Sequence, residues 1–295
     1  MINPSEYKAR YENLTVAGSA DKIKVRKYRL ASMAQFYDPA GTTKFIDALS
    51  KNTDDIELQV DTDNGPKQVT LYSKKSKTPA GSFNEWAAMA RYTFKGKGAP
   101  EHCQLVLQLA DHWGILEGSM QNYADKYLGL DCNGFVGNYL WHIWTAKADD
   151  ATRPWTNLGV GNHDKGPDCG ISGYLDPPRR YVSNWNDLNP TLSYVLGRVN
   201  TTTNRVIDGG GTTLDHIGHV VITEPGVMMA KRINGVETTG LRAIESTGGA
   251  VDPGLSDSWY FLKNPSITKP ANQVFVIFRE SMAAGHQEYS FKIAY

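Results

Sequence analysis

The segment "LGLDCNGFVGNYLWHIW", residues 128–144, places Cys132 directly after an aspartate and at the start of a predicted amphipathic helix. If the helix begins near Cys132, the unpaired backbone N–H groups and the positive end of the helix dipole favour thiolate over thiol. Gly134 would leave room for a substrate to approach. Apolar residues that would bury one face of this helix follow at helical spacing: Phe135, Val136, Tyr139, Leu140 and Ile143. The segment therefore predicts Cys132 as a nucleophile.

A cysteine nucleophile needs a base and a third group that orients the base. His219 opens the apolar run "HVVIT", and Glu245 lies in the next predicted strand, where it can accept a hydrogen bond from the imidazole. His216 competes as the base, but the apolar alternation begins at His219, which favours His219. The two histidines are also candidate zinc ligands, although a structural zinc site needs four protein ligands and the sequence offers no matching pair.

The order of the motifs "DCNGFV", "GHVVIT" and "IESTGG" resembles the NlpC-type family of papain-like cell-wall cysteine peptidases, over about residues 100–280. The resemblance implies that Cys132 is the nucleophile and His219 the base. Glu245 departs from the family, in which the third polar residue is commonly His, Asn or Gln.

The same resemblance supplies the expected substrate-binding residues. A tyrosine ahead of the cysteine often lines the active site of this family, and Tyr123 and Tyr127 both fit that place. Asp131 precedes the nucleophile, and Asn133 stands where the family usually has serine. We therefore expect Tyr123 or Tyr127, together with Asp131 and Asn133, to contact the substrate.

Family membership would imply hydrolysis of an amide in the stem peptides of bacterial peptidoglycan, often between a D-glutamyl residue and a diamino acid. Cys132 would attack the carbonyl, its backbone N–H would help to hold the oxyanion, and His219 would protonate the leaving amine. Water would then release the acyl group, and this chemistry requires no metal or other cofactor.

Two other functions remain open at this stage. The same Cys/His site can serve an intracellular acyltransferase or deamidase, because the groove selects the acceptor. The chain can also be an inactive structural or binding protein of a phage particle or a secretion apparatus that keeps the fold.

The charge balance and the hydropathy of the sequence argue against nucleic acid and membranes as partners. Lys plus Arg and Asp plus Glu each number 31, and no basic stripe suggests nucleic-acid binding. The first 30 residues lack the apolar core of a signal peptide, and the sequence has no membrane-length apolar run. We expect synthesis in the cytoplasm without membrane insertion. To act in the periplasm or on the cell wall, the protein would then have to be delivered by a route that needs no signal peptide. An antibacterial toxin with a cognate inhibitor protein would be delivered in this way.

The chain is expected to adopt an α+β fold with a papain-like core, in which helices pack on an antiparallel sheet. Residues 1–98 would form an N-terminal lobe with a helix from Thr42 and a hairpin around Asn64 and Gly65. Residues 99–295 would form the catalytic domain, with an insertion at about 146–205. We expect Cys103 in the core of a helix that opens at Pro100, and Cys169 in a loop with no amphipathic helix after it. Expected strands cover 219–224, 241–247, 258–263 and 273–280.

Overall fold

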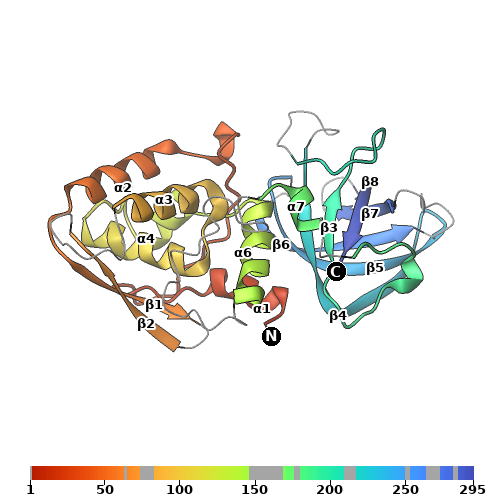
Figure 1. The fold of residues 1–295 in the computed structure, drawn as a ribbon, viewed down its shortest axis with the longest axis horizontal. Helices are drawn as coiled ribbons and strands as arrows, with labels where there is room; N and C mark the ends of the chain where they lie inside the picture. The colour runs from red at the N-terminus through yellow and green to blue at the C-terminus, as the bar shows by residue number, and fades with distance from the viewer. Residues whose placement is uncertain are drawn as a thin grey trace.

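The computed structural model describes residues 2–62, 65–73, 83–145, 169–175, 180–208, 217–249, 253–263, 273–281 and 285–295. Its fold is α+β: a helical part with a two-stranded hairpin stands beside a closed six-stranded antiparallel barrel (Figure 1). Among the described residues, no helix is both long and apolar enough to cross a bilayer.

The helical part contains the elements that the sequence predicts for it. The predicted hairpin is present as β1 and β2, which pair antiparallel. The predicted helix from Thr42 is the greater part of α2, and Pro100 opens α4 as expected. The elements are α1 (Pro4–Glu12), η1 (Ala34–Phe36), α2 (Pro39–Lys51), β1 (Ile56–Thr62), β2 (Gly65–Leu71), α3 (Phe83–Tyr92), the π-helical turn η2 (Thr93–Lys97), α4 (Pro100–His112) and α5 (Met120–Tyr127).

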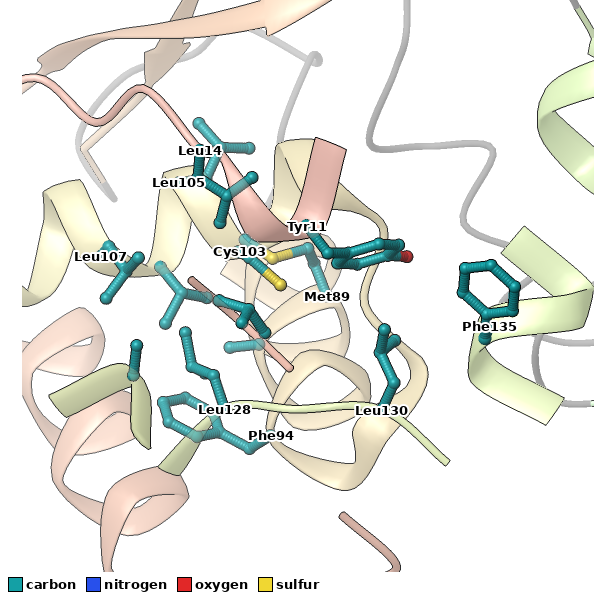
Figure 2. Close-up of a cluster of buried hydrophobic side chains, with 14 of the residues drawn as sticks. Tyr11, Leu14, Met89, Phe94, Cys103, Leu105, Leu107, Leu128, Leu130 and Phe135 are labelled. Atoms are coloured by element: carbon teal, nitrogen blue, oxygen red, sulfur yellow. The ribbon is translucent and has the colours of Figure 1, made fainter. Parts of the chain in front are cut away.

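A large apolar cluster fills the helical part and reaches α6 (Cys132–Thr145), which stands between that part and the barrel (Figures 1 and 2). Cys103 is completely buried in this cluster, as predicted. Tyr11 of α1 and Phe135 of α6 are in ring contact at 6.3 Å and join the helical part to α6. The nucleophile predicted at the start of α6 is therefore carried by a helix that is held from its apolar side.

The barrel closes because β3 pairs with both β4 and β8. Its strands are β3 (Val195–Arg198), β4 (Val220–Ile233), β5 (Val236–Thr247), β6 (Gly254–Lys263), β7 (Phe275–Ser281) and β8 (Gly285–Ala294). The four strands expected from apolar runs correspond to β4, β5, β6 and β7. Strand β3 lies within the stretch 146–205 that was expected to be an insertion, so part of that stretch belongs to the barrel.

The segment after Cys169 corrects one sequence prediction. Cys169 itself lies outside regular structure, but the short helix α7 (Ile171–Leu175) follows it, and its Ile171, Tyr174 and Leu175 side chains are buried. Its five residues were too few to give a recognisable helical periodicity. The described part of the following segment includes the 3₁₀ turn η3 (Trp185–Asp187).

Successive side chains along the barrel strands point alternately into the barrel and toward α6, and both faces are buried. On β4, Val221 belongs to the cluster inside the barrel, whereas Val220 and Ile222 belong to the cluster that includes α6. On β5, Leu241 and Ala243 likewise face the interior, and Ile244 faces the α6 side. By the same period of two, residues 219 and 245 point toward the barrel interior.

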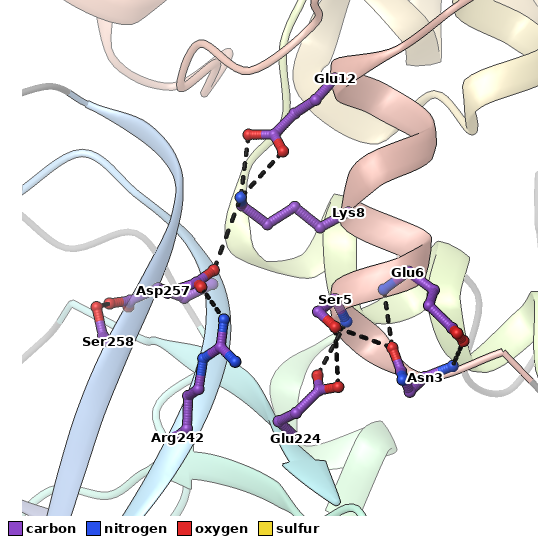
Figure 3. Close-up of polar contacts among 10 residues, drawn as sticks. Asn3, Ser5, Glu6, Lys8, Glu12, Glu224, Arg242, Asp257 and Ser258 are labelled. Carbon is purple, nitrogen blue, oxygen red and sulfur yellow. Dashed lines mark hydrogen bonds and ion pairs between the residues drawn. The ribbon is translucent and has the colours of Figure 1, made fainter. Parts of the chain in front are cut away.

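Helix α1 docks on the barrel through a buried carboxylate (Figure 3). Glu224 of β4 accepts hydrogen bonds from the backbone N and the hydroxyl of Ser5, both at 2.9 Å. Ser5 is in the first turn of α1, where backbone N–H groups lack partners in the helix and negative charge is favourable. The contact fixes α1, and with it Tyr11, against the barrel wall.

We expect Glu224→Ala to lower the free energy of unfolding by about 1–3 kcal/mol, because two partly buried donors of Ser5 lose a charged acceptor. Urea unfolding followed by circular dichroism measures this change. Glu237→Ala is the matched control, since it removes the same charge from an exposed position of β5. Equal effects of the two substitutions would contradict a specific role for the docking contact.

Candidate active site

The start of α6 is built around Asp131, which caps the helix. Its Oδ1 accepts a hydrogen bond from the backbone N of Gly134 at 2.6 Å, and its Oδ2 lies 2.8 Å from Lys97 Nζ. Cys132 is consequently the first residue of the helix, as predicted. Asp131 was predicted to bind substrate, but its carboxylate is buried and engaged in this cap.

Gly134 has a different role from the one expected. A Cβ at this position would lie 1.8 Å from the carbonyl oxygen of Gly96, so the missing side chain allows the π-helical turn to approach the helix. The same turn accepts a hydrogen bond from the backbone N of Asp131 at 3.1 Å through Gly96 O. Gly134 thus makes room for the protein's own backbone, not for a substrate.

Asn133 links Cys132 to Cys169. The Cys132 thiol donates to Asn133 Oδ1 at 3.7 Å, and Asn133 Nδ2 donates to the carbonyl of Cys169 at 3.0 Å. Cys132 as a whole is only 8% exposed. Asn133 therefore orients the thiol and fixes the chain that returns beside it.

His219 directly precedes β4 and lies between Cys132 and Glu245. Its Nε2 is 2.5 Å from Glu245 Oε2, which leaves Nδ1 as the ring nitrogen available to the thiol. Burial alone would lower the pKa of His219, but hydrogen bonds to Cys132 and Glu245, together with the negative charge of Glu245, raise it to about 9. The imidazole is therefore a proton-carrying cation at neutral pH.

Glu245 is completely buried inside the barrel and accepts from four side chains. Its Oε2 accepts from His219 and, at 2.8 Å, from the Tyr260 hydroxyl; its Oε1 accepts from Ser258 and, at 2.7 Å, from Arg279. Burial would raise the pKa of this carboxyl, but the bond to His219 and the charges of His219 and Arg279 hold it well below its usual range. Glu245 is therefore an ionised orienting group.

The structure thus brings together Cys132 from the start of α6, His219 from the residue before β4, and Glu245 from β5. The competing base, His216, lies outside the described residues. Among the described residues, no group of three or more His, Cys, Asp and Glu side chains is arranged to hold a metal ion.

A pocket of about 300 Å³ opens beside His219 at the end of the barrel. Its lining comes from the segment around residues 28–36, from the residues just before β4, from the end of β5 and the two residues after it, and from the strands β3, β7 and β8. The residues are Tyr28, Met33, Gln35, Phe36, Arg198, Ile217, Gly218, His219, Thr247, Gly248, Gly249, Arg279, Tyr289 and Phe291. His219 thus faces this pocket, whereas Cys132 and Glu245 are not among its lining residues.

The tyrosine beside the nucleophile is Tyr28. Tyr123 and Tyr127 lie in α5, where their rings are buried against the helical core, and neither lines the pocket. Tyr28 reaches the pocket because its backbone bridges to Leu130, two residues before Cys132. No pattern in the sequence marked Tyr28, since it is separated from the cysteine motif by almost the whole helical part.

Tyr28 is held as a neutral hydrogen-bond donor. Its ring packs edge-on against Phe36 at 4.9 Å. Burial, followed by the negative charges of Cys132 and Asp131, raises the pKa of Tyr28 far above its ordinary value. The phenol therefore keeps its proton at any physiological pH.

Comparisons of this chain with protein-family models, with curated proteins and with solved structures find no match.

We expect the imidazole of His219 to titrate near pH 9, which ¹⁵N NMR of the histidine side chains would measure. Glu245→Gln should move the midpoint down toward the ordinary value, because the carboxylate that stabilises the imidazolium is gone. Ser258→Ala is the control, since Ser258 contacts the other oxygen of Glu245 and should change the midpoint less. An unchanged midpoint in Glu245→Gln would contradict the proposed charge pair.

The raised pKa of His219 also predicts the pH range over which this residue stabilises the fold. Because the folded-state pKa of about 9 exceeds the ordinary 6.5, protonated His219 contributes stability that is complete below about pH 6.5 and is lost as pH rises through 9. Urea unfolding at pH 6.5 and pH 9.5 should therefore show a larger loss of stability in the wild type than in His219→Gln.

Proposed function

We propose that this protein is a cysteine-dependent amide hydrolase with a papain-like catalytic core that works through a thioester intermediate. The observation that carries the proposal is the chain of contacts from the buried Glu245 through His219 to Cys132 at the first position of α6. A thiol at a helix start, paired with an imidazolium that a carboxylate orients, is the arrangement that nucleophilic catalysis by cysteine requires.

These three residues suit the following mechanism of amide hydrolysis. The Cys132 sulfur attacks the amide carbonyl, and the backbone N–H of Cys132 stabilises the resulting oxyanion, with the Tyr28 hydroxyl as a second donor from the pocket wall. His219 gives its proton to the leaving amine, which leaves an acyl group on sulfur. His219 then takes a proton from water, which attacks the thioester and restores the thiolate. Glu245 remains ionised throughout and keeps the imidazole in place.

The substrates that we propose are stem peptides of bacterial peptidoglycan. This choice is supported by the sequence resemblance of the "DCNGFV" and "GHVVIT" motifs to cell-wall peptidases, and by the site in which these two motifs meet. An antibacterial effector delivered to the periplasm or cell wall, with a cognate inhibitor protein, would fit this substrate.

The activated thiol can be tested without a substrate. We expect iodoacetamide to alkylate Cys132 faster than Cys169 and Cys103 between about pH 5 and 9, and the difference to shrink in His219→Ala. Cys103 serves as an internal control, because burial raises the pKa of its thiol and encloses it. Peptide mass spectrometry gives the three rates. A Cys132 rate equal to that of Cys169, and insensitive to His219, would rule out a paired thiolate.

The substrate class can be tested on purified sacculi. The wild-type protein should release new muropeptides that chromatography and mass spectrometry resolve, whereas Cys132→Ala should release none, because the substitution removes the sulfur that would form the thioester beside His219. Cys169→Ala is the matched control and should retain activity. Product masses separate hydrolysis from acyl transfer and from deamidation. Unchanged sacculi, despite a reactive Cys132, would contradict the peptidoglycan assignment.

A further inference from the structure

Lys97, the last residue of the π-helical turn η2, directs its ammonium group at the start of α6. Its Nζ lies 3.0 Å from Asp131 Oδ1 and 2.8 Å from Asp131 Oδ2, so it contacts both oxygens of the carboxylate. The Lys97 side chain is 13% exposed and the Asp131 side chain 4%. Charges that are enclosed in this way are screened little by solvent and salt, so their effect on neighbouring groups is larger than that of a surface pair.

The main chain of this turn is tied to α6 at two points. The carbonyl of Gly96 accepts the hydrogen bond from the backbone N of Asp131. The carbonyl of Lys97 accepts one from Asn138 Nδ2 at 3.0 Å, and the same amide donates to the carbonyl of Gly134 at 2.7 Å. The backbone of Lys97 is therefore fixed against the helix, which places its ammonium group on the carboxylate of the cap.

The cap of α6 carries a charge that opposes the charge of a thiolate at Cys132. Asp131 directly precedes Cys132, and its carboxylate accepts the N–H of Gly134, so both groups lie at the same end of the helix. The negative charges of Cys132 and Asp131 both raise the pKa of Tyr28, which indicates that they act on the same region. Two negative charges at close range disfavour each other. A counter-charge on the carboxylate removes this conflict.

We propose that Lys97 is a positioning residue of the active site, which holds Asp131 in the helix cap and neutralises it so that the cap does not oppose the Cys132 thiolate. The inference rests on the proposed cysteine-dependent hydrolysis, because it concerns the nucleophile of that reaction. A carboxylate is a strong acceptor for the free N–H groups of a helix start, and the ion pair allows the chain to use one beside a reactive thiol.

Other titratable groups in the described part of the chain also face Cys132. His219 and, behind it, Glu245 come from the barrel. Tyr28 comes from the segment before η1, and Cys169 follows through the asparagine bridge described above. Substitutions of Lys97 and Asp131 leave these four groups in place, so a comparison among variants of the pair isolates the charge of the pair.

A charge cycle on the full chain tests the proposal. It compares the wild type with Lys97→Met, Asp131→Asn and the variant that combines both substitutions. Methionine keeps the length of the apolar stem, and asparagine keeps an oxygen that can cap the helix. For each protein, the rate of Cys132 alkylation by iodoacetamide is measured by peptide mass spectrometry between about pH 5 and 9, which gives the midpoint at which the thiolate forms.

We expect Lys97→Met to raise this midpoint by roughly one pH unit, because the charge of Asp131 is no longer balanced by Lys97, and Asp131→Asn to lower it. The combined variant should return close to the wild-type midpoint. Lys97→Arg keeps the charge and should keep the midpoint. Lys95→Met is the matched control, since it removes the same charge from an exposed position of the same turn and should leave the midpoint unchanged.

Opposite shifts that cancel in the combined variant support the electrostatic role, because a general loosening of the helix would not change sign with the charge removed. If Lys97→Met does not fold, Asp131→Asn and the combined variant still differ only in the Lys97 charge, and the combined variant should have the higher midpoint. Equal midpoints in these two proteins, or an equal shift in Lys95→Met, would overturn the role of Lys97.

These results are distinguishable from a failure of the proposed function. If Cys132 is fast and dependent on His219 while its midpoint ignores the charge of Lys97, the inference is wrong and the hydrolase proposal stands. If Cys132 of the wild type instead reacts like an ordinary thiol and does not respond to His219→Ala, the proposed function fails, and the role of Lys97 fails with it.

Discussion

The buried carboxylate of Glu245 is the interaction on which the site depends. An ionised group inside a barrel is tolerated only when its charge and its lone pairs are satisfied, and here His219, Ser258, Tyr260 and Arg279 satisfy them. Three strands and the residue before a fourth must be in register for these donors to meet. The network that keeps the charge stable is thus the same one that sets the angle and the charge of the imidazole.

Cys132 is positioned by a second set of contacts, outside the barrel. Helix α6 is held by the helical part on one side and by the outer face of β4 and β5 on the other. The hydroxyl of Ser246 donates to the carbonyl of Leu130 at 2.6 Å. Ser246 directly follows Glu245, and Leu130 is two residues before Cys132. This single hydrogen bond connects the strand that orients the base to the segment that leads into the nucleophile helix.

Local sequence signals predicted the elements and the three central residues, and long-range packing supplied the rest. Cys132 and His219 were recognisable because each begins an apolar periodic run, and Glu245 because it lies in the next strand. The closure of the barrel was not predictable, since β3 is only four residues long and is paired by distant strands. Tyr28 and Gly134 were missed or misread for the same reason: their roles are set by backbone segments that the chain brings in from elsewhere.

Closure of the barrel by β3 and β8 has a consequence for the timing of assembly. The pocket takes Phe291 from β8 and Arg279 from β7, whereas Tyr28 and Cys132 are synthesised long before them. Until β8 pairs with β3, the barrel has two open edges and the pocket lacks the part of its wall that β8 supplies. A ribosome-bound chain therefore carries Cys132 long before the pocket is complete, so the proposed amide chemistry depends on the addition of β8.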